Sequence, residues 1–375
     1  MKLKCNRKEL YEAVQIVEAV VASTATRPIL QDIRINAGDQ GLELSATDLE
    51  VGIRYFAKEG IDVLDGGSVV VPGARIGSIL REWAEEKIEL TVEENICHLV
   101  GQDSHFKLFG SGLEMFPSIP DFAEEAEDEE SKPFVVRGEV IAEMIRKTAY
   151  AVAVEGAHQN LRGVLLTAKG DRARMVATDG RRLAWIERGL EEPTTELKVG
   201  IVPVKGLNHL LKVLSVNSSG VVKVQLKDAY FLAKTERAVV CCRLIEGQYP
   251  NVDEVIPSDN DKKVEFETER LLSAVKRAAL LTSSECKVIR FRFEPDKLML
   301  SSEAANLGEA RVELSVPYTG ESFDIGFNPD FIIDTLRVIT KGKITMELKQ
   351  PNTAGVIKDE QGYLSLIMPI NLSQE

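Results

Sequence analysis

The sequence predicts an α+β protein in which one unit of helices and antiparallel strands occurs three times. Segments with helical apolar periodicity recur about every 125–130 residues, and alternating apolar segments with turn residues follow each of them. The triplet ATD also occurs twice, at residues 46–48 and 177–179. Recurrence at a fixed spacing indicates a repeat architecture. A unit with several consecutive strands and few helices is typical of an antiparallel sheet whose helices lie on one face.

The first helix of each copy is indicated by apolar residues at steps of three and four. In the first copy these residues are Leu10, Val14, Val17 and Val21, which would form one buried face. The matching stretches are residues 7–23, 138–153 and 268–283.

A short apolar strand leads into a second helix in each copy. A proline stands near each expected helix start, where a missing N–H costs least. These prolines are Pro72, Pro203 and Pro329. The corresponding stretches are residues 68–83, 198–214 and 322–339.

Strands are expected in the remaining segments of each copy. Alternating apolar residues on both sides of Gly/Asp or Pro/Asp turns predict strand pairs; these occupy residues 30–55, 161–185 and 288–314. Further strands are expected in residues 87–122, 221–257 and 343–372.

The repeat divides the chain into three predicted domains, residues 1–130, 131–259 and 260–375. The acidic segment EEAEDEESK at residues 124–132 would join the first two domains as a solvated linker, and residues 258–261 would join the last two.

Composition narrows the class of protein. The chain has 375 residues, 44% of them apolar and 28% charged, which suits a globular protein of two or three domains and excludes general disorder. We expect neither a membrane-spanning helix nor a signal peptide, because long apolar runs are missing. The five cysteines are odd in number and form no C-x-x-C pair, which favours a reducing compartment with buried or idle thiols and argues against a disulfide framework or a zinc site. The adjacent Cys241 and Cys242 are expected to pack in a core.

No known catalytic pattern is present, so the protein is not expected to be an enzyme or to hold a metal or cofactor. The P-loop, the dinucleotide-binding glycine motif, H-E-x-x-H and G-x-S-x-G are missing, and no two of the four histidines have helix-face metal spacing. Asp48 and Asp179 suit either of two roles. They could form a carboxylate pair for metal-assisted phosphotransfer. Alternatively, they are turn residues whose side chains hydrogen-bond to the neighbouring backbone, and this second interpretation is preferred.

Several strings, in order and at matching spacing, resemble the bacterial DNA polymerase III beta subunits, the sliding clamp family. The resemblance covers essentially the whole chain. Its strings are RPIL (27–30), ATDLE (46–50), VATDGRRLA (176–184), EGQYPNVDEVIP (246–257), IGFNPDFIIDTL (325–336) and LIMPINL (366–372).

The resemblance implies a head-to-tail homodimer that closes as a ring of six clamp domains around double-stranded DNA and tethers the polymerase. Twelve helices packed around a circle would leave an opening of about 26 Å, which passes a duplex. The net charge of the chain is −13, which argues against DNA binding when taken alone. However, the six helix stretches together carry about +3 and the remainder about −16. A mildly positive lining within an acidic body suits sequence-independent, salt-sensitive phosphate contacts.

The resemblance also implies where DNA and partners bind. DNA contacts are expected from Arg27, Arg75, His158, Gln159, Arg162 and Lys205. A partner-peptide pocket between the second and third copies would be lined by Leu161, Thr178, Gly180, Arg181, Arg182, Leu183, Pro250, Val255, Val356, Leu366, Ile367, Met368, Pro369 and Ile370. The subunit seam would use Phe106, Leu108, Leu280 and Leu281.

Partners implied by the family are the polymerase III alpha subunit, the clamp loader, and other polymerases and repair proteins that carry short clamp-binding peptides. The implied location is the cytoplasm, in association with the nucleoid and without membrane attachment. An apolar groove with an adaptable methionine suits several peptide anchors. This sequence departs from the family pattern at Val252, Glu254 and Asn371, which affects the polar rim of the pocket. At the seam, Asp103 and the Leu307–Gly308 stretch do not supply the charges that the family uses, so a more apolar seam is expected.

Two alternatives remain beside the clamp. One is a peptide-binding adaptor that does not bind DNA, and the other is a metal-dependent phosphotransfer enzyme using Asp48 and Asp179.

Overall fold

The computed structural model describes residues 1–22, 27–123, 132–154, 158–216, 220–227, 229–257, 259–283, 287–304, 307–340 and 342–372. Within these ranges, no helix combines the length and apolar character that a membrane crossing needs. Cys5, Cys97, Cys241 and Cys242 are buried free thiols, as predicted, and Cys286 lies outside the described residues. Burial raises the pKa of Cys5 to about 12 and that of Cys241 to about 11.

In its described residues, the first copy of the repeat contains two helices and nine strands. They are β1 (Lys2–Asn6), α1 (Arg7–Glu18), β2 (Asp32–Gly38), β3 (Gly41–Thr47), β4 (Val51–Ala57), β5 (Ile61–Asp65), β6 (Gly67–Pro72), α2 (Gly73–Glu82), β7 (Lys87–Glu93), β8 (Ile96–Val100) and β9 (His105–Phe109).

The second copy keeps this order with fewer, longer strands. It runs β10 (Phe134–Arg137), α3 (Gly138–Thr148), β11 (Gly163–Thr178), β12 (Arg182–Pro203), α4 (Val204–Val216), β13 (Val221–Lys227), β14 (Tyr230–Lys234) and β15 (Ala238–Arg243). β11 takes the place of a strand pair, and Gly170 in its middle has φ +59°, a left-handed conformation that glycine adopts without strain.

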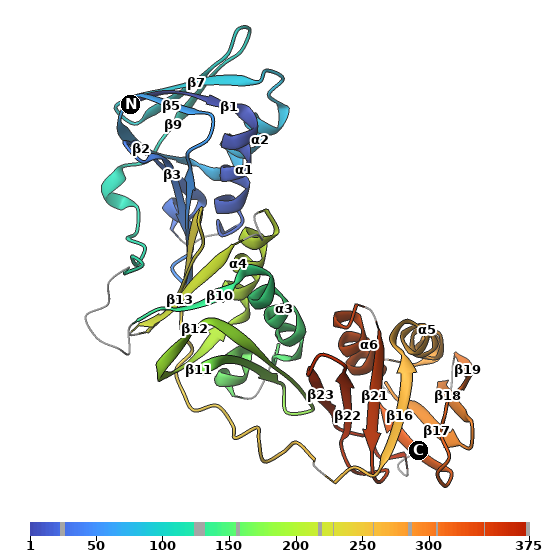
Figure 1. Ribbon diagram of the computed structural model, residues 1–375. Coiled ribbons are helices and arrows are strands. Elements are labelled where there is room, and N and C mark those ends of the chain that lie inside the picture. The colour runs from blue at the N-terminus through green and yellow to red at the C-terminus, as the bar shows by residue number, and fades with distance from the viewer. Residues whose placement is uncertain are drawn as a thin grey trace. The chain divides into compact units, whose positions relative to one another are not determined.

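The third copy returns to the pattern of the first. It runs β16 (Lys262–Glu267), α5 (Thr268–Ala278), β17 (Ile289–Glu294), β18 (Lys297–Ala304), β19 (Gly308–Ser315), β20 (Phe323–Phe327), α6 (Pro329–Val338), β21 (Lys343–Leu348), β22 (Gly355–Asp359) and β23 (Leu364–Ile367). Each copy therefore begins strand–helix and ends helix–strands, which confirms the predicted threefold repeat with two helices per copy (Figure 1).

By its internal contacts the chain forms two compact units, which are described separately. The first unit comprises residues 1–142, 169–171 and 190–244, and the second comprises residues 143–168, 172–189 and 245–375. The predicted domain boundaries stay a prediction.

In the first unit, antiparallel strands form two sheets. One has the order β5-β1-β7-β8-β9, and the other runs from β10 through β13, β14, β15, β4, β3 and β2 to β6. α1 packs against α2 and against β3 and β4. Leu10, Val14 and Val17 are fully buried, as predicted. The helix ends at Glu18, however, so Val21 lies beyond it and is only half-buried.

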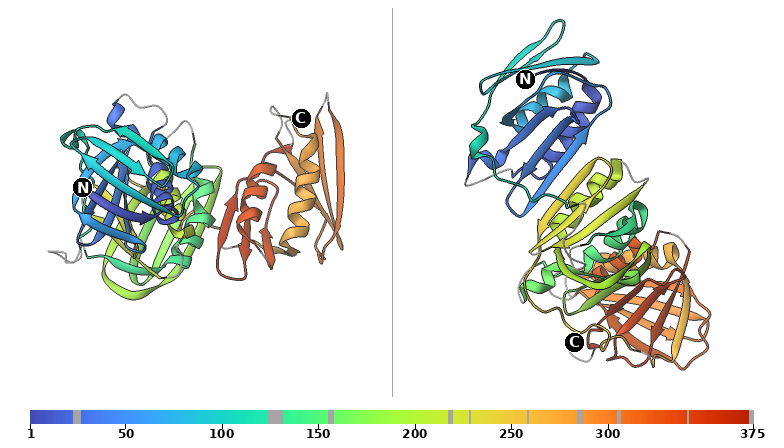
Figure 2. Two further views of the ribbon diagram at one scale, coloured as in Figure 1. Left: turned by 90° about the horizontal axis from the view of Figure 1, so that it is seen from above. Right: turned by 60° about the vertical axis from the view of Figure 1, so that its left-hand side comes forward.

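In the second unit, β16-β21-β22-β23 continue to the start of β12, and β19-β18-β17-β20 form a separate sheet. α5 contacts α6 and also contacts strands of both sheets (Figure 2). α6 starts where the Asn328 side chain accepts a hydrogen bond from the Asp330 N–H, with Pro329 as its first residue. The predicted proline position at the helix start is confirmed here.

Candidate functional site

The residues predicted for a partner pocket all belong to the second unit. β12 begins antiparallel to β23, with Leu183 opposite Leu366, and β23 lies beside β22, with Leu366 opposite Val356. These three side chains form one apolar cross-strand row and are at most 5% exposed. The row is therefore a buried layer of the site, not an open surface.

The turn between β11 and β12 is held by short-range hydrogen bonds. Asp179 Oδ1 accepts from the backbone N–H groups of Arg181 and Arg182, at 2.9 and 3.0 Å. Thr178 Oγ1 donates to the Arg182 carbonyl at 2.6 Å, and Gly180 has φ +86°. Gly180 and Arg181 are thereby presented to solvent at the end of the strands.

Asp48 occupies the same position in the first unit and has the same bonds. Its Oδ1 accepts from the N–H groups of Glu50 and Val51, at 3.0 and 2.8 Å. The turn interpretation of both aspartates is confirmed. In the described part of the chain, no group of three or more His, Cys, Asp or Glu side chains is placed to hold a metal.

Arg182 points into the protein and does not form an open wall. Its Nε donates to Asp179 Oδ2 at 3.0 Å, one Nη donates to Asp334 Oδ2 at 2.8 Å, and the other donates to the Tyr150 carbonyl at 2.7 Å. The guanidinium also lies over the rings of Tyr150 and Phe331, 5.2 and 4.7 Å from their centroids. Its side chain is only 10% exposed.

A group of hydroxyls lies behind Arg182. Tyr150 Oη is 2.6 Å from Tyr363 Oη and 3.0 Å from Thr335 Oγ1, and Thr335 Oγ1 is 2.9 Å from Ser365 Oγ. Burial raises the pKa of both tyrosines: at Tyr150 it outweighs hydrogen bonds that lower the pKa, and at Tyr363 the contact with Tyr150 raises the pKa further, so both phenols are neutral at neutral pH. This network fixes β23 to α6.

The segment 248–255 forms the other side of the site. The Thr178 N–H donates to Tyr249 Oη at 3.1 Å, and Arg174 forms an ion pair with Asp253 at 3.0 Å. Burial raises the pKa of Tyr249, so its phenol stays protonated. These contacts hold the segment along β11.

Apolar side chains of the predicted pocket differ in exposure. Met368 and Val255 are 45% and 56% exposed, whereas Leu161 and Ile367 are buried. β23 ends at Ile367, so Pro369 and Ile370 follow the strand, and the Ile370 N–H donates to the Gly326 carbonyl.

Sequence reasoning missed several residues of this site. Tyr150, Asp334, Phe331 and Tyr249 come from three separate segments and only meet in the folded chain. The string around residues 325–336 pointed to the helix but gave no sign that Asp334 contacts Arg182.

All six residues predicted to contact DNA are exposed. Arg75 lies in the first turn of α2, and Arg27 directly precedes a 3-10 turn. His158 directly precedes another 3-10 turn, Gln159–Arg162, of which Gln159 and Arg162 are the first and last residues. They belong to different units: Arg27, Arg75 and Lys205 to the first, the others to the second.

Lys205 differs from the other predicted DNA contacts because it is already paired. Its ammonium forms ion pairs with Asp48 and with Glu50, the latter at 2.9 Å. Burial works to lower its pKa, but the hydrogen bonds to these two carboxylates outweigh that effect and raise it. A phosphate would therefore compete with two carboxylates for this side chain.

The predicted seam residues lie at two sheet edges. Phe106 and Leu108 are on β9, the last strand of its sheet, and Phe106 is 41% exposed. Leu280 and Leu281 lie in a 3-10 turn that contacts β18 and β19, and β19 ends the other sheet. Leu280 is 77% exposed.

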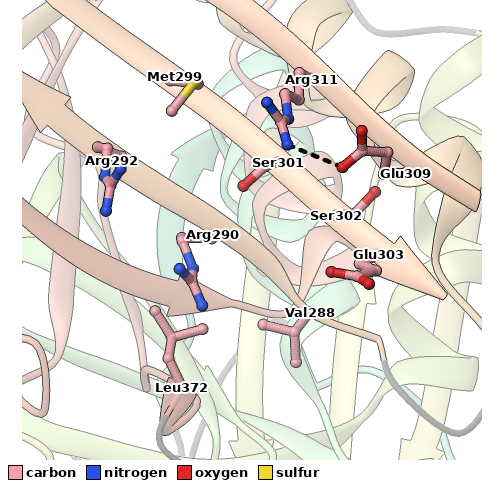
Figure 3. A pocket seen from close by; sticks show the side chains of 10 residues that line it. All are labelled: Val288, Arg290, Arg292, Met299, Ser301, Ser302, Glu303, Glu309, Arg311 and Leu372. Atoms are coloured by element: carbon pink, nitrogen blue, oxygen red, sulfur yellow. Dashed lines mark hydrogen bonds and ion pairs between the residues drawn. The ribbon is translucent and has the colours of Figure 1, made fainter. Parts of the chain in front are cut away.

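A cavity of about 270 Å³ also opens on the solvent side of β17, β18 and β19. Figure 3 shows Arg290 extending toward Leu372, and Arg311 paired with Glu309. Arg292 is bound by both oxygens of Asp324. Because carboxylates already pair with these arginines, the cavity has no strong net charge.

Comparisons with known proteins agree along the whole chain. Family models of the DNA polymerase III beta subunit match in order, the N-terminal domain at residues 1–120, the central domain at 135–251 and the C-terminal domain at 253–371. The Beta sliding clamp of Chlamydia muridarum is 28% identical over 382 residues and covers 100% of both chains. That of Pseudomonas aeruginosa is 27% identical over 379 residues, covering 99% of this chain and 100% of the relative.

Solved structures agree with these relatives. A sliding clamp from Pseudomonas aeruginosa bound to griselimycin has a TM-score of 0.92 at 28% identity, covering 99% of this chain and 100% of the other. The DNA polymerase sliding clamp from Bacillus subtilis has a TM-score of 0.92 at 24% identity, covering 99% of each chain, and shows the shared fold.

Proposed function

The chain belongs to the DNA polymerase III beta subunit family, and from this premise we propose that it closes as a homodimeric ring around double-stranded DNA. The family consists of non-catalytic sliding clamps that act as processivity factors of the polymerase. A ring held on DNA by topology needs little direct affinity, so an acidic chain can hold a polymerase at its template.

The observation that carries this proposal is the threefold unit that ends in two open sheet edges. β9 and β19 are each the last strand of their sheet, and exposed apolar side chains lie at both. An unpaired edge strand offers its backbone to a partner strand. Pairing β9 of one subunit with β19 of a second is a head-to-tail contact, and two such contacts close a ring.

DNA contacts in the ring are assigned to Arg27, Arg75, His158, Gln159, Arg162 and Lys205. The exposed arginines are the stronger members of this set, because Lys205 already binds two carboxylates. Contacts with phosphates alone carry no sequence information, which suits sliding.

Partner peptides would bind in the second unit, beside the 178–182 turn. Met368 and Val255 are exposed and would supply adaptable apolar contacts, whereas the row of Leu183, Leu366 and Val356 is buried. The proposed partners are the polymerase III alpha subunit, the clamp loader, and other polymerases and repair proteins. The proposed location is the cytoplasm, at the nucleoid, and the proposed domains are residues 1–130, 131–259 and 260–375.

The deciding experiment measures retention on DNA after loading. Labelled protein is loaded on a nicked circular plasmid with a clamp loader, and the plasmid is then linearised with a restriction enzyme. A ring stays on the circle and leaves from free ends, whereas blocking the ends with bound protein restores retention. Equal retention on circular and unblocked linear DNA would overturn the proposal. Peptide binding without any retention would favour the adaptor alternative.

A further inference from the structure

Two histidines converge on the outward face of the β8–β9 hairpin. His98 Nδ1 lies 2.9 Å from His105 Nε2, and the rings stack with centroids 5.2 Å apart at 28°. No sequence spacing along a helix suggested this pair, because it forms across two strands.

The hairpin register places the two rings together. Lys107 is directly opposite His98, and Val100 is directly opposite His105, so the two histidines are diagonal neighbours on one face. The turn is closed by a hydrogen bond from the Gly101 N–H to the Ser104 carbonyl at 2.8 Å. Because the turn fixes the register of the two strands, the backbone itself brings His98 and His105 close together.

We propose that His98 and His105 form a two-ligand site for a borderline transition-metal ion such as Cu²⁺, Ni²⁺ or Zn²⁺. Imidazole nitrogens are preferred ligands of these ions. Metal–nitrogen bonds of about 2.0–2.1 Å at a tetrahedral angle need nitrogens about 3.3 Å apart. The two nitrogens are already within a few tenths of an ångström of that separation, and a small rotation of exposed side chains supplies the rest.

The surroundings leave room for the ion. The Lys107 ammonium, which would repel it, lies over the Phe109 ring, 5.3 Å from the centroid and on the side of Lys107 away from His105. Since the described residues contain no group of three potential ligands, the chain supplies two ligands and water fills the remaining positions. An ion bound in this way requires both nitrogens to be unprotonated, so the affinity falls as pH falls.

A metal bound here would add a second link between β9 and β8, beside their backbone hydrogen bonds. β9 is an edge strand that is held to its sheet through β8 alone, and it carries Phe106 on its other face. The inference does not depend on ring closure, since both ligands lie in one hairpin of one chain.

The test uses the full-length chain, freed of metal with a chelator that is then removed. Cu²⁺ is titrated and followed by electron paramagnetic resonance, and Zn²⁺ is titrated by calorimetry. We expect one ion per chain with hyperfine coupling to two nitrogens. His98→Gln and His105→Gln should each reduce coupling to one nitrogen. Each should also weaken binding at least about tenfold, because losing a hydrogen-bond partner of a ligand already costs about that much and losing the ligand itself costs no less.

Lys107→Gln is the matched control on the same face, and it should keep both nitrogens and bind at least as tightly as the wild type, because it removes only a neighbouring positive charge. Mg²⁺, which prefers oxygen ligands, should not compete. Unchanged Cu²⁺ or Zn²⁺ binding in the His98→Gln/His105→Gln double variant would overturn the proposal, as would failure of the wild-type chain to bind either ion. DNA retention of that double variant reports separately on the clamp, so the two proposals fail independently.

Discussion

At the scale of single residues, the buried side chain of Arg182 holds the 178–182 turn of the site in place, although it does not line the site's surface. Its guanidinium is bound by Asp179, Asp334 and the Tyr150 carbonyl, and its backbone carbonyl accepts from Thr178. The cation therefore connects the 178–182 turn to α6. The position of the turn, and with it that of Arg181, depends on this buried charge.

Asp334→Asn should weaken peptide binding by disturbing this turn. The change removes one charged partner of a buried guanidinium, which costs about 1–3 kcal/mol in stability. We expect peptide affinity to fall several-fold, measured by fluorescence anisotropy with a labelled clamp-binding peptide. Asp330→Asn on the same helix, which pairs with exposed Lys287, is the control. Equal peptide affinity in both variants would show that Arg182 does not position the site.

Glu143 should contribute a pH-dependent part of the stability. Burial raises the pKa of its carboxyl, but hydrogen bonds from Arg188 and Lys147 outweigh burial and hold the pKa below its ordinary value of 4.5. Because the pKa of Glu143 is lower in the folded than in the unfolded protein, its ionised carboxylate stabilises the folded state at pH values above 4.5. This contribution is lost as the pH falls through the folded-state pKa. Denaturant unfolding at several pH values should show that the free energy of unfolding of Glu143→Gln falls less steeply at acid pH than that of the wild type. Glu139→Gln, at a more exposed position on the same helix, should show the same fall as the wild type.

At the scale of elements, edge strands and turns determine where other molecules can add. β9 ends one sheet and β19 another, while most other strands have two neighbours. The inner face of β9 carries Phe106, whose ring contacts Trp83 at 5.8 Å between centroids, and Leu108, which is half-buried. The outer face carries His105, Lys107 and Phe109. Alternation along the strand therefore separates the proposed seam from the proposed metal site.

Leu108→Arg should weaken the dimer. A charge placed in an apolar contact without a partner is costly, so the dissociation constant should rise at least about tenfold, or about 1.4 kcal/mol. Analytical ultracentrifugation over a concentration series measures it. Phe109→Ser, on the opposite face of β9, is the matched control and should dimerise normally. A normal dimer for Leu108→Arg would place the seam elsewhere.

At the scale of the whole molecule, charge is distributed unevenly along the chain. The six helices carry a net charge of about +3, although the chain as a whole carries −13. In the proposed ring, an acidic body would discourage DNA from binding nonspecifically outside, while weak phosphate contacts along the helices would permit sliding.

Arg75→Glu should reduce the salt dependence of DNA contact without affecting the fold. Removing one phosphate contact lowers the slope of log affinity against log salt by about 1. Binding of the protein to short duplexes across a salt series gives the slope. Arg311→Glu, at an exposed position away from the predicted set, is the control. Equal slopes for the two variants would remove Arg75 from the DNA contacts.

The repeat, the six helices, the turns at Asp48 and Asp179, and the family could all be predicted from the order of the residues alone. These features are encoded locally, because periodicity, helix-start prolines and turn residues act within a few positions of one another. Three features became apparent only in the folded chain: Arg182 is buried against Tyr150 and Phe331, Lys205 forms ion pairs with Asp48 and Glu50, and His98 contacts His105. Such contacts depend on strand register and on packing between distant segments, which the linear order of residues does not display.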